Sequence, residues 1–279
     1  EGVKTADGQV MKARYVVLAP GRGGASWLKE VASSLGLKTA TNPVDVGLRV
    51  EVPSVVAEGL TDVLYEPKLV YYSRRFDDKV RTFCVAPHGY VITEYYDGII
   101  TVNGQSFSDR EKWTENTNFA ILVSAAFTEP FEDPIAYGKH LASLTNLISG
   151  SVLVQRLGDL LRGRRSTPER IARSLVKPTL PSATPGDLAF VMPYRFLMDI
   201  LEMLKALDAI MPGVYERHTL LYGAEVKFYS LKVEVDEHLE TPIKGLFAAG
   251  DGAGLTRGLV QASISGLLVA EEIARREGA

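Results

Sequence analysis

The sequence predicts a mixed fold, α/β at its two ends and α+β between them, and three observations support this. Near each end, a short apolar run leads into a glycine-rich turn and then a helical pattern, the order found in an α/β unit. From residue 41 the chain changes to successive short β-type runs and then to helices, which is typical of an antiparallel sheet with covering helices. We therefore expect residues 1–40 and 240–279 to form two pieces of one α/β domain, with residues 41–239 inserted as an antiparallel-sheet and helix domain.

The composition limits the class of protein. Of 279 residues, 46% are hydrophobic and 23% are charged, which is enough apolar material for a large core. The net charge of −3 provides no overall positive field for nucleic acid or an anionic membrane. A single cysteine excludes an intramolecular disulfide, and the histidines lack metal-ligand spacing, so we predict no metal site. No apolar run approaches the roughly 18 residues of a membrane span, and we expect a cytoplasmic protein.

The first α/β segment opens with a predicted β-hairpin around Asp7-Gly8, since Asp-Gly tolerates positive φ. The apolar run Tyr15–Ala19 does not alternate with polar residues, as in strands buried on both faces, and it leads into the turn Pro20–Gly24. A helix is predicted next, because Leu28, Val31, Ala32 and Leu35 keep helical spacing.

The inserted region is predicted from its periodicity. The β-type runs are Val46–Val52, Val80–Val85, Tyr90–Tyr96 and Ile99–Val102, the last two forming a hairpin around Asp97-Gly98. Helical patterns follow at Ile135–Ile148, Leu153–Leu161, Pro168–Leu175 and Phe196–Met211. A final long β run covers Val226–Val235. These elements make up the antiparallel-sheet and helix domain.

The second α/β segment carries the most specific motif. Residues 245–249 are predicted as a buried strand, 250–254 as a glycine loop, and a helix then continues to Arg275-Arg276. Backbone amides and the positive end of the helix dipole converge at such a turn and suit a pyrophosphate or another anion. Asp251 offers a carboxylate for ribose- or ribityl-type hydroxyls. The alternative is a tight turn before a helix with no ligand.

The segment 245–254 resembles the C-terminal flavin-binding motif of two-dinucleotide-binding-domain flavoproteins, and Val16–Gly21 resembles the second short motif of that superfamily. Further segments resemble a family of largely uncharacterised bacterial FAD-dependent dehydrogenases, and the likeness covers nearly the whole chain. These segments are Val46–Glu51, Arg81–Cys84, Asn118–Ala120, Gln155–Asp159 and Glu225–Tyr229.

The resemblance implies FAD as the cofactor and a set of cofactor-binding residues. The implied α/β domain is a split remnant of an FAD-binding domain, and it flanks the inserted region. The helix that begins near residue 255 would point toward the pyrimidine edge of the flavin, where a dipole or a cation stabilises the anionic reduced form. The implied residues are Pro20, Gly21, Gly250, Asp251, Gly252, Ala253, Gly254, Arg257 and Gly258.

One expected motif is absent from the sequence. Such flavoproteins bind the ADP half of FAD with a strand, Gly-x-Gly-x-x-Gly and a helix, and no glycines of this chain keep that spacing. We therefore expect the chain to be the C-terminal part of a longer protein. By itself it should bind FAD weakly or not at all and purify nearly colourless.

The predicted function is that of the C-terminal portion of an FAD-dependent oxidoreductase, a dehydrogenase acting on an unknown small-molecule substrate, with NAD(P)H a candidate electron donor. Two alternatives remain: a non-catalytic interaction or assembly module, and a flavin-dependent nucleic-acid-modifying enzyme. The second would use the basic stretch 156–177, although charge runs usually mark solvated faces and no aromatic residues are interleaved there, so we do not expect nucleic acid as a partner. Unpaired strand edges would permit an oligomer.

The catalytic residues are not identified from the sequence. Cys84 and His88 lie four positions apart and could relay electrons or protons near a flavin, but inert packing is the more common role for both residue types. Neither a Gly-x-Ser-x-Gly elbow nor a carboxylate dyad is present, which argues against a hydrolase.

Overall fold

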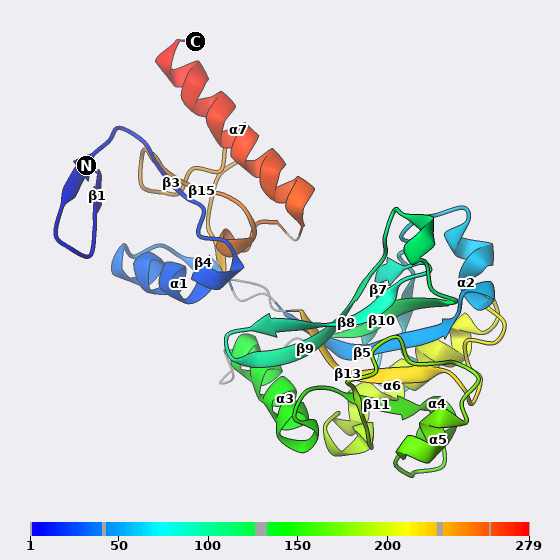
Figure 1. The fold of residues 1–279 in the computed structure, drawn as a ribbon. Coiled ribbons are helices and arrows are strands. Elements are labelled where there is room, and N and C mark those ends of the chain that lie inside the picture. The colour runs from blue at the N-terminus through cyan, green and yellow to red at the C-terminus, as the bar shows by residue number, and fades with distance from the viewer. Residues whose placement is uncertain (1, 41–42, 126–132, 228–230, 257, 279) are drawn as a thin grey trace. The chain divides into compact units, whose positions relative to one another are not determined.

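The computed structural model describes residues 2–40, 43–125, 133–227, 231–256 and 258–278 (Figure 1). The chain divides into two compact units. Unit 1 comprises Glu1–Pro43, Phe127–Pro134 and Phe228–Ala279, and unit 2 comprises Val44–Ala126 and Ile135–Lys227. From the sequence, the boundaries between the two domains were predicted at residues 40/41 and 239/240.

Unit 2 is built on a seven-stranded sheet in the order β12-β11-β13-β5-β10-β7-β6. Every neighbouring pair is antiparallel except β11 and β12, so the sheet is mixed. The prediction of a mixed fold, with a sheet and helices, is confirmed. The strands are β5 (Val44–Pro53), β6 (Val70–Tyr72), β7 (Lys79–Ala86), β10 (Asn116–Ala125), β11 (Leu153–Arg156), β12 (Thr184–Pro185) and β13 (Leu220–Lys227).

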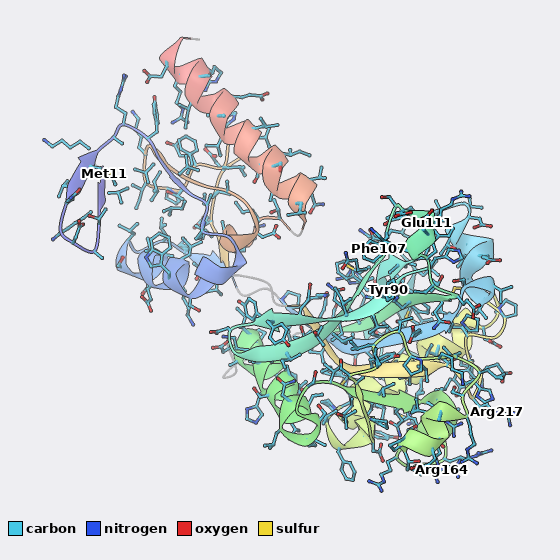
Figure 2. All side chains as sticks on the ribbon, viewed as in Figure 1. Met11, Tyr90, Phe107, Glu111, Arg164 and Arg217 are labelled. Carbon is cyan, nitrogen blue, oxygen red and sulfur yellow. The ribbon has the colours of Figure 1, made fainter. Side chains whose placement is uncertain are left out.

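The predicted hairpin around Asp97-Gly98 is present. β8 (Tyr90–Tyr96) and β9 (Ile99–Gln105) pair antiparallel, and both turn residues have positive φ, 48° and 76°. β9 also contacts β13, β5 and β7, so the hairpin covers part of the large sheet. Tyr90 and Phe107, both labelled in Figure 2, contact edge to face with ring centroids 5.8 Å apart.

Three helices of unit 2, α2, α4 and α6, contact strands of this sheet. In α6 one apolar stripe includes Phe196, Ile200, Met203 and Leu204, all buried, and the helix contacts β5, β7 and β10. The helices are α2 (Ser54–Thr61), α3 (Pro134–Ser149), α4 (Leu157–Leu160), α5 (Pro168–Ala172) and α6 (Tyr194–Leu207).

Two predicted elements of unit 2 were wrong in type or extent. The helix predicted over Leu153–Leu161 is strand β11 followed by the single turn α4. Residues 152–155 are buried one after another, which suits a strand inside a sheet, and β11 pairs with β13 and β12. The β run predicted over Val226–Val235 begins earlier, at Leu220 in β13. Residues 228–230 lie outside the described part of the chain, and β14 (Lys232–Val233) follows.

Unit 1 contains three small two-stranded pairings. β1 (Gly2–Lys4) and β2 (Val10–Lys12) form the predicted opening hairpin, and β14 pairs with β4 (Thr39–Ala40). β3 (Val16–Leu18) pairs in parallel with β15 (Leu246–Ala248). The helices are α1 (Ala25–Ser34) and α7 (Leu259–Glu277), with short 3₁₀ turns η1 (Arg22–Gly24) and η4 (Asp251–Ala253) before them. Within the described residues, no helix is both long enough and apolar enough to cross a membrane.

The core of unit 1 holds the parallel pair in place. One cluster joins residues of β3, α1 and β15, including Leu18, Leu28 and Ala248, and a second joins Phe247 to Val269 of α7. Arg276, near the end of α7, forms ion pairs with Glu240 at 2.7 Å and with Glu272 of its own helix. Apolar packing therefore attaches α7 to β15, and the ion pair with Glu240 attaches α7 to the segment that precedes β15.

Gly266 lies in the exposed middle of α7, where a Cβ would meet no atom within 4 Å. We expect Gly266→Ala to stabilise the helix by about 0.5–1 kcal/mol, because alanine loses less backbone entropy on folding. Hydrogen–deuterium exchange of the α7 amides in the full chain should slow accordingly. Faster exchange in Gly266→Ala would contradict this description of α7. In Gly254→Ala, where a Cβ would lie 2.5 Å from the Leu231 carbonyl oxygen, exchange should accelerate.

Candidate functional site

The predicted cofactor loops follow two parallel strands of unit 1. Leu18 of β3 lies opposite Ala248 of β15, and the Ala249 amide donates to the Leu18 carbonyl oxygen over 3.0 Å. Pro20–Gly21 comes after β3 and Gly250–Gly254 after β15, so both loops leave the carboxyl ends of neighbouring strands. This edge is where ligands bind to open α/β sheets.

The structure brings these two loops into direct contact. A Cβ atom on Gly252 would lie 2.3 Å from the carbonyl oxygen of Gly21 and 2.7 Å from its amide nitrogen. Only glycine fits at position 252, because backbone occupies the place of a side chain. A Cβ on Gly21 would meet no atom within 4 Å, so space remains beside that part of the loop.

Hydrogen bonds fix the shape of the 250–254 loop. The Thr256 hydroxyl donates to Asp251 Oδ1 over 2.5 Å, and the Gly250 amide donates to Ser265 Oγ of α7 over 2.9 Å. Ala253 is fully buried in the core of unit 1. The Asp251 carboxylate therefore has at least one partner within the loop, whereas its sequence-predicted role was toward hydroxyls of a ligand.

Residues 255–258 connect the 250–254 loop to the start of α7. Gly258 is the residue before the helix, its carbonyl accepts from the Ala262 amide over 2.8 Å, and no side chain caps the first turn. No acidic residue lies in that turn either, so the helix terminus keeps its positive partial charge. Arg257, the remaining predicted residue, lies outside the described residues.

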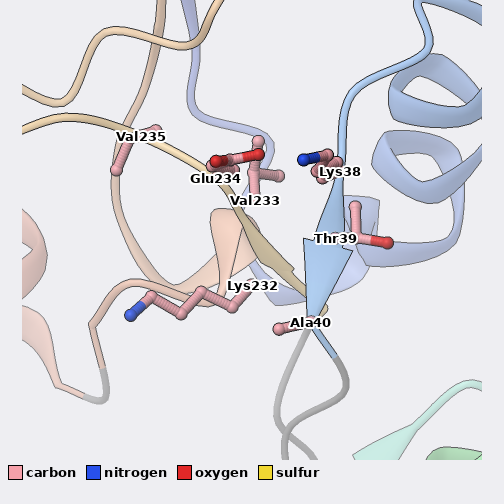
Figure 3. Close-up of a pocket in the computed structure, with 7 residues that line it drawn as sticks. All are labelled: Lys38, Thr39, Ala40, Lys232, Val233, Glu234 and Val235. Carbon is pink, nitrogen blue, oxygen red and sulfur yellow. The ribbon is translucent and has the colours of Figure 1, made fainter.

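A pocket of about 360 Å³ lies in the same unit (Figure 3). β4 contributes Thr39 and Ala40 to its lining, and β14 contributes Lys232 and Val233. Gly254 of the 250–254 loop packs against Leu231, the residue before β14. The pocket and the loop therefore share one segment of chain. The remaining lining residues are Lys38, Glu234 and Val235.

Cys84 and His88 belong to unit 2 and make separate contacts. Burial raises the pKa of Cys84, which disfavours the thiolate, and its amide donates to Glu66 Oε1 over 3.2 Å. The His88 ring stacks on Trp113 at 4.4 Å, and its Nδ1 lies 3.1 Å from the Thr114 carbonyl oxygen. The His88 ring thus has two packing contacts of its own, and the buried Cys84 thiol is disfavoured as a thiolate.

Sequence reasoning missed a row of charged residues buried in the large sheet. Glu51 of β5 accepts from the Tyr222 hydroxyl over 2.5 Å, from Asn116 Nδ2 over 3.0 Å and from the Thr179 hydroxyl over 2.5 Å. Burial raises the pKa of Glu51, while these hydrogen bonds act in the opposite direction. Glu51 is thus a buried titratable group with a defined set of donors.

Arg49 lies two residues before Glu51, on the same face of β5, and has no exposed surface. Its Nε donates to Asn118 Oδ1 over 2.8 Å, its Nη2 donates to the Cys84 carbonyl over 2.6 Å, and its Nη1 lies 3.4 Å from Glu225 Oε1. The signal that could have revealed this row is the alternation in Val44–Val52, where apolar even positions alternate with Asp45, Gly47, Arg49 and Glu51.

The described residues contain no group of three or more His, Cys, Asp or Glu side chains that could hold a metal ion. The basic stretch 156–177 lies on unit 2, whereas the glycine loops lie on unit 1. The candidate site on unit 1 is a pair of glycine loops that follow two parallel strands.

This chain belongs to the family described as "FAD-dependent protein, C-terminal domain-like", whose model matches residues 44–228. The match coincides with unit 2 almost residue for residue and leaves the glycine loops outside it. An "Uncharacterized protein" of Clostridium beijerinckii is 26% identical over an alignment of 221 residues, and the match covers 74% of this chain and 40% of that relative. The chain thus spans about two fifths of the length of that curated relative. The resemblance to an FAD-dependent family is confirmed.

Proposed function

We propose that this chain is the part of an FAD-dependent oxidoreductase that holds the ribityl and phosphate region of the flavin. The observation that carries the proposal is the contact of Gly252 with Gly21, which joins the ends of β3 and β15 beside open space at Gly21. Membership in an FAD-dependent family supports it from an independent direction.

The residues present fit this part of a flavin. Glycines at 21 and 258 leave room for a ligand to approach the backbone, since a Cβ at either position would meet nothing within 4 Å. The uncapped start of α7 would attract phosphate oxygens, and the Asp251 carboxylate would accept from ribityl hydroxyls. When bound, the flavin supplies hydride or electron-pair transfer. In the proposed enzyme the domain formed by 1–40 and 240–279 is the cofactor side, the inserted region binds a small-molecule substrate, and NAD(P)H is the candidate donor.

Titration of the chain with FAD, followed by flavin fluorescence and absorbance, tests the proposal. We expect weak binding, because no Gly-x-Gly-x-x-Gly unit is present for the ADP half. Gly252→Val should weaken FAD binding by about tenfold or more, because its side chain would displace the Pro20–Gly21 loop. Gly266→Ala, on the exposed face of α7, is the matched control and should leave the affinity unchanged.

The longer Clostridium beijerinckii relative provides the second arm of the experiment. It should purify with bound FAD that bleaches anaerobically when a reductant is added. Equal FAD affinity in Gly252→Val and Gly266→Ala would remove the glycine loops from the site. A colourless relative that takes up no FAD would favour the interaction-module alternative over an oxidoreductase.

A further inference from the structure

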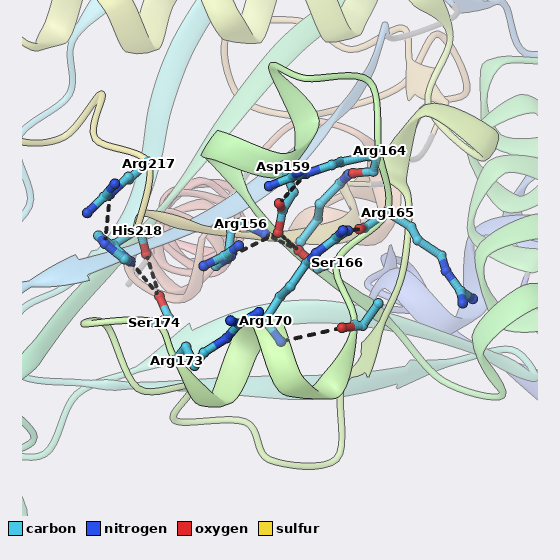
Figure 4. Close-up of polar contacts among 12 residues, drawn as sticks. Arg156, Asp159, Arg164, Arg165, Ser166, Arg170, Arg173, Ser174, Arg217 and His218 are labelled. Carbon is cyan, nitrogen blue, oxygen red and sulfur yellow. Dashed lines mark hydrogen bonds and ion pairs between the residues drawn. The ribbon is translucent and has the colours of Figure 1, made fainter.

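The basic stretch of unit 2 is organised around a buried carboxylate. Asp159 of α4 has no exposed surface, and its two oxygens accept from different arginines, Oδ2 from Arg156 Nε and Oδ1 from Arg164 Nε, each over 2.9 Å (Figure 4). The Ser166 hydroxyl also donates to Oδ2 over 2.8 Å. Burial alone would raise the pKa of Asp159, but these hydrogen bonds outweigh it and lower the pKa, so the carboxylate is ionised at neutral pH.

Both arginines are held by one nitrogen only. The hydrogen bonds to Asp159 use Nε, and within the described residues the terminal nitrogens Nη1 and Nη2 of Arg156 and Arg164 have no hydrogen-bond partner. The Arg156 side chain is 14% exposed and that of Arg164 is 41% exposed. A guanidinium fixed at Nε presents its terminal nitrogens as a rigid pair of donors, the geometry that suits the oxygens of a phosphate.

A third arginine borders the same turn. The Arg217 carbonyl accepts from the Gly158 amide over 3.1 Å, and Arg217 Nε donates to His218 Nε2 over 3.0 Å. Burial and the positive charges of Arg217 and Arg156 lower the pKa of His218, so the ring is neutral at neutral pH. The Ser174 hydroxyl lies 3.4 Å from His218 Nδ1 (Figure 4). Arg164 and Arg217 are both labelled at the periphery of unit 2 in Figure 2.

The basic stretch itself carries an excess of positive charge. Residues 156–177 carry six arginines and one lysine against Asp159 and Glu169, an excess of five positive charges in a chain of net charge −3. Asp159 offsets only one of the two guanidinium groups that it holds. Such a concentration of one sign raises the local concentration of anions.

We propose that Arg156, Arg164 and Arg217 form an anion site that binds phosphate groups of a phosphorylated ligand. The buried Asp159 positions two of the three cations, and Arg217 extends the site toward His218. A solvated basic face would not require a buried carboxylate, because removing a carboxylate from water costs several kcal/mol unless well-placed partners repay the cost. The ligand could be a nucleotide with a phosphate monoester or an RNA strand, which share this chemistry. The proposal does not depend on flavin binding.

Calorimetric titration of the full chain with inorganic pyrophosphate, at about 50 mM ionic strength, tests the site directly. Each of Arg164→Gln and Arg217→Gln should weaken binding by about tenfold to a hundredfold, since each removes charge-assisted hydrogen bonds. Lys112→Gln, which removes an exposed charge from the 3₁₀ turn Arg110–Lys112 of the same unit, is the matched control and should change affinity less than about twofold.

Arg217→Gln keeps the test valid even if Arg164→Gln perturbs the fold, because Arg217 is not paired with Asp159. In addition, bound pyrophosphate should raise the pKa of His218, measured from its ring proton resonances after assignment with His218→Gln. A role for the three arginines in folding alone would leave that titration curve unmoved. No pyrophosphate binding, or equal affinity in Arg217→Gln and Lys112→Gln, would overturn the proposal.

Two further ligands distinguish the sources of the phosphate. A preference for NADPH over NADH that is lost in Arg217→Gln would identify a nucleotide monoester as the ligand. Tighter binding of an oligouridine RNA, with a steep salt dependence that Arg217→Gln reduces, would identify a strand of phosphodiesters. Either result supports a phosphate site on these arginines.

Discussion

Replacing Arg49 with methionine is expected to lower the unfolding free energy of unit 2 by about 3–5 kcal/mol. The guanidinium has no exposed surface, and its loss would leave Glu225, Asn118 Oδ1 and the Cys84 carbonyl without this donor in a buried environment. Lys227 Nζ lies 3.1 Å from Glu225 Oε1 and still compensates part of the negative charge of Glu225. We therefore expect a loss of unfolding free energy near the lower end of this range.

The two tryptophans allow the units to be followed separately. Trp27 lies in α1 of unit 1 and Trp113 in unit 2, so a Trp27→Phe background makes Trp113 fluorescence a reporter of unit 2 in urea unfolding. Arg162→Met, at an exposed arginine, is the control and should change the unfolding free energy by less than about 0.5 kcal/mol.

A double replacement tests the cause of the instability. If the lost stability arises from an uncompensated buried charge, Arg49→Met combined with Glu225→Met should be more stable than Arg49→Met alone, because the apolar pair leaves no orphaned carboxylate. A loss below about 1 kcal/mol in Arg49→Met would contradict the description of this buried row.

The sequence predicted correctly those elements whose conformation is determined by residues within the element itself. The Asp97-Gly98 hairpin follows from two residues that accept positive φ, and α6 follows from one apolar stripe. The helix predicted over residues 153–161 was wrong because the apolar spacing of these residues suits a helix and a strand equally well. Pairing of β11 with β13, which lies more than 60 residues away, decides the outcome and has no local signal.

The candidate site divides in the same way. The glycines of 250–254 indicate a turn before a helix, but the sequence does not reveal that Gly252 rests on Gly21, because that contact joins the two ends of the chain. The charged row of β5 was visible in the sequence as an alternation of apolar and polar residues, which ordinarily indicates a strand with one face exposed to solvent. Here the β8–β9 hairpin approaches that face, and a Cβ on Gly104 would lie 1.8 Å from Arg49 Nη2, so the charges are buried.

Asp199 of α6 is expected to make the stability of unit 2 depend on pH. Its carboxyl group is fully buried, and it lies beside the Asp78 carboxyl and the Ser73 hydroxyl, of which Ser73 acts to lower its pKa. Burial, together with the neighbouring Asp78 carboxylate, raises the pKa of Asp199 to about 6. Arg195 holds Asp78 at 2.5 Å and lowers the pKa of that second carboxyl, so Asp78 stays ionised while Asp199 retains its proton longer.

The direction of the effect follows from the raised pKa. Between an unfolded pKa of about 4 and the folded value of about 6, the folded state binds the proton more tightly, so this contribution to stability is present at low pH and is lost as pH rises through 6. Asp199→Asn removes the buried charge and should stabilise unit 2 by about 1–3 kcal/mol near pH 8. Near pH 4 the gain should vanish, since the wild-type carboxyl is already protonated there.

Urea unfolding at both pH values, with Trp113 as the reporter in the Trp27→Phe background, measures this difference. Asp62→Asn, at an exposed aspartate that ends α2, provides the control and should shift the unfolding free energy by less than about 0.5 kcal/mol at either pH. If Asp199→Asn gave the same stability change at both pH values, proton uptake by Asp199 would not be its cause. A destabilised Asp199→Asn near pH 8 would mean that the ionised carboxylate has a partner that offsets its burial.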